Sequence, residues 1–69
     1  MNKVDIYTKG HCPYCHRAKA LLTQKKTSFN EIEIDIMPEL RSKMIERAKG
    51  KSTVPQIFIK DYHVGGCDE

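Results

Sequence analysis

Two cysteines separated by two residues, Cys12 and Cys15, carry the chemistry that this sequence most clearly indicates. Pro13 between them suits the first position of a helix, because its missing N–H has no intrahelical partner there and its φ angle is already helical. A helix that begins at Pro13 puts Cys12 at the N-cap and Cys15 one turn inside. The two sulfurs would then be close enough to form a disulfide, which favours thiol–disulfide exchange.

The expected surroundings of Cys12 favour its thiolate, the form that attacks a disulfide. An N-cap sulfur faces unpaired backbone N–H groups and the positive end of the helix dipole. Four side chains near it in sequence add positive charge: Lys9, His11, His16 and Arg17. Because a preformed thiolate needs no base, we interpret both histidines as exposed residues that strengthen this field when protonated. Cys15 should be more shielded and remain a thiol until it resolves an intermediate.

Two other interpretations of the cysteine pair are half of a zinc site and two inert structural cysteines. A structural zinc needs four ligands, and His63 and Cys67, four positions apart, make a mixed site conceivable. Redox use fits better, because Pro-Tyr separates the first two thiols and a helix follows them directly. Cys67 itself is either a small buried residue or a partner in a regulatory or adventitious disulfide.

Length and charge restrict the remaining functions. The 69 residues predict one domain over 1–69, and 12 Lys and Arg against 9 Asp and Glu give a net charge of +3, too small to indicate nucleic-acid binding. No apolar run approaches the roughly 20 residues that cross a bilayer. The opening Met-Asn-Lys-Val has no apolar signal segment, so we expect a cytoplasmic protein, in which disulfides are catalytic or transient.

The first half of the chain predicts a strand, a helix and a second strand. Alternating residues predict a strand over 3–8, which leads directly into the dithiol. A helix over about 13–26 follows, and its apolar face comprises Tyr14, Ala18, Leu21 and Leu22. The next strand opens near Phe29 and directs Ile32, Ile34 and Ile36 to the core, while the acidic residues between them face water.

The second half predicts a helix and two strands. The helix begins at Pro38, ends at Gly50 and carries an apolar stripe of Leu40, Met44, Ile45 and Ala48. Residues 54–59 predict a strand buried on both faces, and residues 61–64 turn into a short neighbour. The order β-α-β-α-β-β, with one crossover and one hairpin, predicts an α/β fold with a mixed four-stranded sheet.

Three motifs in this order resemble those of a dithiol glutaredoxin of the small bacterial type, over essentially the whole chain. They are Ile6-Tyr7-Thr8-Lys9 before Cys12-Pro13-Tyr14-Cys15, then Thr53-Val54-Pro55-Gln56-Ile57-Phe58-Ile59, then Gly65-Gly66-Cys67-Asp68. The resemblance implies a thioredoxin-like fold and a glutathione-dependent oxidoreductase that reduces protein disulfides and glutathione mixed disulfides. Glutathione is its expected reducing co-substrate, and no metal, nucleic acid or membrane is expected.

The resemblance also implies roles for residues around the dithiol. It makes the Val54–Pro55 bond cis, although only about 5–6% of X–Pro bonds in folded proteins are cis. It assigns the glycine carboxylate of glutathione to Lys9 and Gln56, and the glutathione backbone to Thr53, Val54 and Pro55. Tyr14, between the two thiols, is either a core aromatic or a residue beside the glutathione groove, and aromatic-lined pockets favour the second. The resemblance assigns the γ-glutamyl end of glutathione to Gly66, Cys67 and Asp68.

The sequence departs from the family pattern after the last motif. Glutaredoxins of this type continue with a helix that packs beside the first one, whereas this sequence stops at Glu69. We therefore expect the final family helix to be missing, which would leave an apolar face open for self-association and lower the stability of the monomer.

Two alternative functions would use the dithiol differently. In the first, the protein is reduced by thioredoxin reductase and does not bind glutathione, but Lys9, Gln56 and Asp68 argue against this. The second is an iron–sulfur-cluster or metal-binding glutaredoxin-like module, and Pro13 argues against it because it stiffens the loop that would have to open around a cluster.

Overall fold

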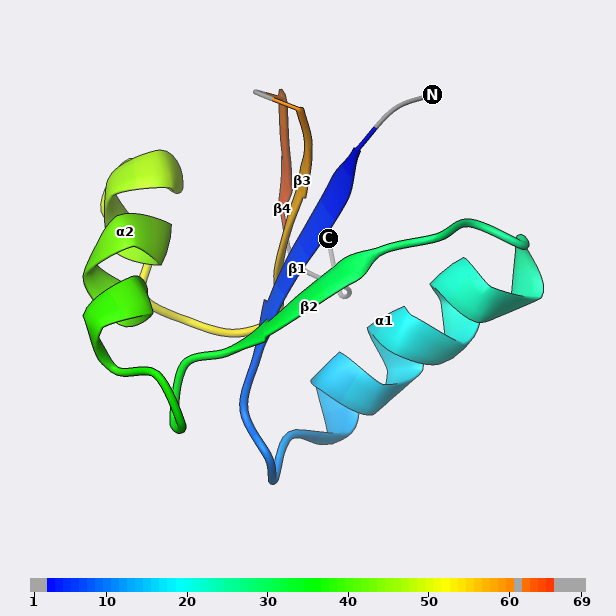
Figure 1. The fold of residues 1–69 in the computed structure, drawn as a ribbon, viewed down its shortest axis with the longest axis horizontal. Coiled ribbons are helices and arrows are strands. Elements are labelled where there is room, and N and C mark those ends of the chain that lie inside the picture. The colour runs from blue at the N-terminus through cyan, green and yellow to red at the C-terminus, as the bar shows by residue number, and fades with distance from the viewer. Residues whose placement is uncertain (1–2, 61, 66–69) are drawn as a thin grey trace.

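The computed structural model describes residues 3–60 and 62–65, and its six elements follow the predicted order. They are β1 (Val4–Thr8), α1 (Pro13–Gln24), β2 (Asn30–Glu33), α2 (Glu39–Arg47), β3 (Gln56–Ile59) and β4 (Tyr62–Gly65). The strands lie side by side in the order β2-β1-β3-β4. The two helices lie on opposite sides of this sheet (Figure 1).

The sheet is mixed, as the sequence predicts. Strand β1 pairs in parallel with β2 and antiparallel with β3, and β3 pairs antiparallel with β4. Because β1 and β2 are parallel, the loops that leave their carboxyl ends emerge at the same edge of the sheet (Figure 1). Within the described residues, no helix has both the length and the apolar character that crossing a bilayer requires.

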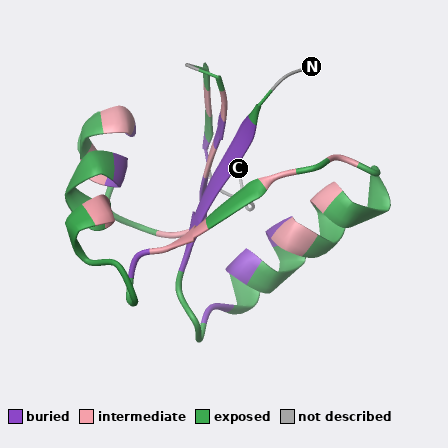
Figure 2. Cartoon of the chain, in the orientation of Figure 1, coloured by how far each residue is buried: buried purple, intermediate pink, exposed green. Residues whose placement is uncertain are grey.

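The core surrounds the central strand β1, all five residues of which are buried (Figure 2). On the α2 side of the sheet the buried cluster consists of Tyr7, Ile34, Met44, Ala48 and Phe58. The rings of Tyr7 and Phe58 meet edge to face, with centroids 5.7 Å apart. This geometry adds aromatic attraction to the burial of apolar area.

Arg47, the last residue of α2, ties that helix to the sheet. Its Nη1 contacts Asp5 Oδ2 at 3.2 Å and donates to the hydroxyl of Tyr7 at 3.0 Å, while its Nη2 donates to the carbonyl of Lys60 at 3.1 Å. The guanidinium carbon also lies 4.2 Å from the centroid of the Phe58 ring. Ion pair, hydrogen bonds and cation–π contact together hold one end of α2 against β1 and β3.

The second strand is shorter than predicted. It ends at Glu33, whose carbonyl accepts the N–H groups of Ile36 at 3.3 Å and Met37 at 3.0 Å in a turn. Ile34 is buried as predicted, but the prediction for Ile36 was wrong, because its side chain is 69% exposed. The carboxylate of Asp35 accepts the N–H of Gly10 at 3.0 Å, and this bond anchors the turn to the loop after β1.

The inward face of α1 also differs from the predicted one. Cys15 and Ala18 are buried and Leu22 is half-buried, whereas Tyr14 and Leu21 are 49% and 48% exposed. Neighbouring helical residues are rotated by about 100°, so a stripe that includes Cys15 turns Tyr14 away from the sheet. The α2 stripe is confirmed, with Met44 and Ala48 buried and Leu40 and Ile45 half-buried.

The boundaries of α2 and β3 differ from the predicted ones by small amounts. Pro38 is the N-cap of α2, and the helix itself begins at Glu39. Gly50, with a φ of +100°, donates its N–H to the carbonyl of Ile45 and closes the turn after the helix. Strand β3 starts at Gln56, two residues later than predicted, because the cis Val54–Pro55 bond precedes it.

We predict that Phe58 and Tyr62, both in the β3–β4 hairpin, contribute very unequally to stability. Phe58 is 1% exposed and Tyr62 is 71% exposed. Truncating a buried phenylalanine to alanine costs about 3–5 kcal/mol, so Phe58→Ala should lower the free energy of unfolding by that amount in urea titrations. The matched variant Tyr62→Ala should change it by about 0.5 kcal/mol or less. Equal losses would contradict this description of the core.

Candidate active site

The dithiol lies where three segments of the chain meet. Strand β1 leads into the loop over residues 9–12, which ends with Cys12, and α1 begins immediately after it. Tyr7 near the end of β1 pairs with Gln56 at the start of β3, so the segment before β3 lies beside this loop. As a result, the sulfur of Cys12 is 3.8 Å from the carbonyl oxygen of Val54, 42 positions away in sequence.

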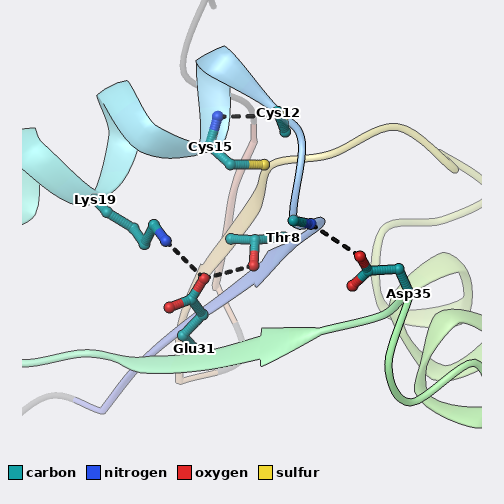
Figure 3. A network of polar contacts seen from close by, with 7 residues as sticks. Thr8, Cys12, Cys15, Lys19, Glu31 and Asp35 are labelled. Atoms are coloured by element: carbon teal, nitrogen blue, oxygen red, sulfur yellow. Dashed lines mark hydrogen bonds and ion pairs between the residues drawn. The ribbon is translucent and has the colours of Figure 1, made fainter.

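Cys12 is the N-cap of α1, as predicted. Its backbone is extended, with φ −146° and ψ 102°, and its sulfur accepts the N–H of Cys15 at 3.2 Å (Figure 3). Its carbonyl accepts the N–H of His16 at 3.1 Å. The side chain therefore satisfies one of the free N–H groups of the first turn. Such a hydrogen bond is stronger when the accepting sulfur is negatively charged.

The environment of Cys15 favours the protonated thiol. This residue is fully buried, and burial is the main reason why its pKa rises from 9.0 to about 12. The hydrogen bond with the Cys12 side chain also raises the pKa, while the backbone N–H of Lys9 and the charge of Lys19 act in the opposite direction. Both cysteines are free thiols. One sulfur thus lies at the helix N-terminus and the other is kept neutral beneath it.

The Val54–Pro55 peptide bond is cis, as the resemblance implied. Pro55 is buried and Val54 half-buried, while Thr53 is exposed. These three residues therefore lead from the surface into the sheet next to Cys12. Their predicted contacts with glutathione stay predictions.

The side chain of Gln56 is buried and hydrogen-bonded within the protein, unlike a side chain that is free to bind a ligand. It is 1% exposed, and its Nε2 donates to the Thr53 hydroxyl at 3.2 Å. Its Oε1 lies 2.6 Å from Nε2 of His63, whose ring stacks on Phe58 with centroids 4.7 Å apart. The predicted role of Gln56 toward a glycine carboxylate stays a prediction, and it would require the amide to exchange at least one of these partners.

Of the remaining predicted site residues, Lys9 and Tyr14 are exposed, and three others lie outside the described part of the chain. Lys9 is exposed in the loop after β1, and Tyr14 is half exposed on α1, with its ring centroid 5.8 Å from the guanidinium carbon of Arg17. The predicted γ-glutamyl site consists of residues outside the described part of the chain: Gly66, Cys67 and Asp68. Residues 3–60 and 62–65 contain no group of three or more His, Cys, Asp and Glu side chains that could hold a metal ion.

A polar network below the dithiol was missed by the sequence analysis. Glu31 Oε2 accepts from the Thr8 hydroxyl at 2.7 Å and from Lys19 Nζ at 2.9 Å (Figure 3). The strand pattern predicted only that Glu31 faces water. Lys19 and Glu31 come from different elements, 12 positions apart, and no spacing rule pairs a helical lysine with an acidic residue of the next strand.

Comparison with known proteins gives consistent matches over nearly the whole chain. A family model described as glutaredoxin matches residues 4–64. Glutaredoxin 3 of Escherichia coli strain K12 is 58% identical over 69 residues, which cover 100% of this chain and 82% of that protein. Glutaredoxin 1 of Rickettsia prowazekii is 50% identical over 70 residues, which cover 100% of this chain and 74% of that protein.

Solved structures show the same arrangement of elements. The solution structure of glutaredoxin from Brucella melitensis matches with a TM-score of 0.81 and 59% identity, covering 99% of this chain and 73% of that one. The crystal structure of a buckwheat glutaredoxin–glutathione complex matches with a TM-score of 0.83 and 33% identity, covering 97% of this chain and 63% of that one. These matches confirm the predicted thioredoxin-like arrangement of a mixed sheet with flanking helices.

We predict that Cys12 and Cys15 of the reduced protein react very differently with iodoacetamide. At pH 7 to 9 Cys15 should remain unmodified while Cys12 is alkylated, because the pKa of the buried Cys15 thiol is raised to about 12 and only thiolates react. Peptide mapping by mass spectrometry after short exposures measures both sites. Unfolding in urea should remove the difference, and comparable labelling of both cysteines in the folded protein would contradict the assigned burial.

Proposed function

Since this chain belongs to the glutaredoxin family, we propose that it is a glutathione-dependent thiol–disulfide oxidoreductase with Cys12 as the nucleophile and Cys15 as the resolving thiol. Glutaredoxins are oxidoreductases, so the family itself supports an enzyme of this class. The observation that carries the finer proposal is the unequal placement of the two sulfurs. Cys12 caps the helix and accepts a backbone N–H, whereas Cys15 is buried as a thiol one turn further on.

The first step is attack by the Cys12 thiolate on a disulfide or on a glutathionylated protein thiol. A bond forms between the Cys12 sulfur and one sulfur of the substrate, and the substrate S–S bond breaks. The departing sulfur leaves with the electron pair and takes a proton from water. The N–H of Cys15, 3.2 Å from the attacking sulfur, is already placed to donate to a thiolate there and needs no rearrangement to do so.

The intermediate can then be resolved by either of two thiols. Glutathione can attack the mixed disulfide directly, or Cys15 can lose its proton and attack the Cys12 sulfur to form the Cys12–Cys15 disulfide. In the second case two glutathione molecules supply the two electrons that restore the dithiol and leave as glutathione disulfide. Because the Cys15 and Cys12 side chains hydrogen-bond to each other, they are close enough for the second route.

Glutathione would lie across the segment before β3 and the loop after β1. The buckwheat relative was crystallised as a complex with glutathione, which supports the same ligand here. We assign the backbone of Thr53, Val54 and Pro55 to the peptide part of glutathione, because the Val54 carbonyl lies beside the reacting sulfur. The exposed ammonium of Lys9 suits a carboxylate, and Tyr14 would cover one side of the groove. We keep the γ-glutamyl end with Gly66, Cys67 and Asp68.

The proposed substrates are protein disulfides and glutathionylated proteins. The half-exposed ring of Tyr14 beside the helix N-terminus offers an apolar contact for a substrate polypeptide. A catalytic cycle that returns both cysteines to thiols fits a reducing compartment, and on that ground we place the reaction in the cytoplasm.

We predict a division of labour between the cysteines. Cys12→Ser should reduce exchange with every substrate to the rate of the Cys12→Ser/Cys15→Ser double variant, because the nucleophile is gone. Cys15→Ser should keep most reduction of glutathione mixed disulfides but lose most direct reduction of protein disulfides. Rates with hydroxyethyl disulfide plus glutathione and with insulin measure the two activities. Equal losses in both single variants would contradict these roles.

We further predict that glutathione, rather than thioredoxin reductase, supplies the electrons. In coupled assays that follow NADPH oxidation, turnover should be high with glutathione and glutathione reductase and near background with thioredoxin reductase alone. The Cys12→Ser variant reports the uncatalysed rate in both assays. Efficient turnover with thioredoxin reductase in the absence of glutathione would overturn the proposed co-substrate but leave the dithiol chemistry intact.

A further inference from the structure

We propose that Lys19, held in place by Glu31, is a positioning residue that promotes proton loss from Cys15 during the dithiol branch of the reaction. This inference rests on the proposed function and assigns a role to a network that the function does not itself require. Lys19 touches neither of the reacting sulfurs. It acts through the electrostatic field at the buried thiol.

The geometry places this cation one helical turn from the resolving thiol. Cys15 and Lys19 are four residues apart on α1, so both side chains project from the same face of the helix toward the end of β1. Figure 3 shows the Cys15 sulfur and the Lys19 ammonium directed to the same side of α1, above Thr8 and Glu31. Thr8 is fully buried at the end of β1, and so is Cys15.

Glu31 holds the ammonium in this position. Its Oε2 accepts from Lys19 Nζ at 2.9 Å and from the Thr8 hydroxyl at 2.7 Å, so one carboxylate oxygen links α1, β1 and β2. These hydrogen bonds lower the pKa of Glu31, and the bond to Glu31 raises the pKa of Lys19. Both groups are therefore charged at neutral pH. An unattached lysine would lose this position to side-chain rotation.

The groups that act on Cys15 come from the loop after β1 and from helix α1. Burial and the Cys12 side chain disfavour its thiolate, whereas the backbone N–H of Lys9 and the charge of Lys19 favour it. Further from the sulfur, Glu33 acts on Lys19 and His16 acts on Glu31. When Cys12 is part of a mixed disulfide, its sulfur is neutral and no longer repels a Cys15 thiolate. Burial is then the main obstacle to ionisation, and Lys19 opposes it.

The step that Lys19 would assist is intramolecular. The Cys15 thiol releases its proton to water, the new thiolate attacks the Cys12 sulfur, and the Cys12–Cys15 bond forms. The bond between Cys12 and the substrate sulfur breaks, and the substrate sulfur leaves with the electron pair and is protonated from water. Glutathione attack on the same mixed disulfide bypasses Cys15. A role of Lys19 at Cys15 therefore predicts an effect on only one of the two branches.

The test compares Lys19→Met with Lys25→Met, which removes an exposed ammonium just beyond the other end of α1. In single-turnover experiments with a protein disulfide, Lys19→Met should form the Cys12–Cys15 disulfide about threefold to tenfold more slowly at pH 7, because a tenfold loss of thiolate corresponds to one unit of pKa. The rate should recover at higher pH. At pH 7, Lys19→Arg and Lys25→Met should form the Cys12–Cys15 disulfide at the rate of the unchanged chain. Lys19→Gln should be as slow as Lys19→Met.

A second background separates this role from a structural one. In a Cys15→Ser protein, Lys19→Met should leave the reduction of glutathione mixed disulfides unchanged within about twofold, since Cys15 no longer takes part. Equal slowing in both backgrounds, or a slower rate with an unshifted pH profile, would overturn the inference. Normal exchange in the unchanged chain with no effect of Lys19→Met would overturn this inference alone. Absence of Cys12-dependent exchange in the unchanged chain would overturn the proposed function as well.

Discussion

The pairing of the central strand with both of its neighbours is the constraint on which the site depends. Strand β1 runs parallel to β2 and antiparallel to β3, and all five of its residues are buried. A strand buried on both faces has its register set by packing, since a slip of one residue would exchange its two faces. That register brings the carboxyl end of β1, which carries the dithiol, to the amino end of β3, where Val54 and the cis Pro55 lie.

The same arrangement creates the difference between the two sulfurs. Helix α1 starts directly after the loop that leaves β1, so Cys12 lies at the helix N-terminus while Cys15 turns inward against the sheet. A helix N-terminus favours negative charge, whereas burial disfavours it. Two identical side chains three residues apart thus receive opposite electrostatic environments, and the proposed roles of nucleophile and resolving thiol rest on this difference.

Polar contacts also hold the elements around the dithiol together. Asp35 joins the turn after β2 to Gly10 in the loop before Cys12, and Glu31 joins β2 to the end of β1 and to α1. On the other side of the sheet, Arg47 connects α2 to β1 and to the end of β3. Each contact links an element that carries the site to one that does not, so the position of the dithiol depends on residues distant from it in sequence.

Local patterns in the sequence determined the order of the elements, the helix start at Pro13, the N-cap position of Cys12 and the mixed sheet, because spacing and turn chemistry act over a few residues. Resemblance to a family supplied the cis Val54–Pro55 bond, which local preferences alone would have made trans. Only the tertiary structure decided that Ile36 faces solvent, that the amide of Gln56 is occupied by Thr53 and His63, and that Lys19 meets Glu31. These outcomes depend on how distant segments pack against one another, which periodicity along the chain does not encode.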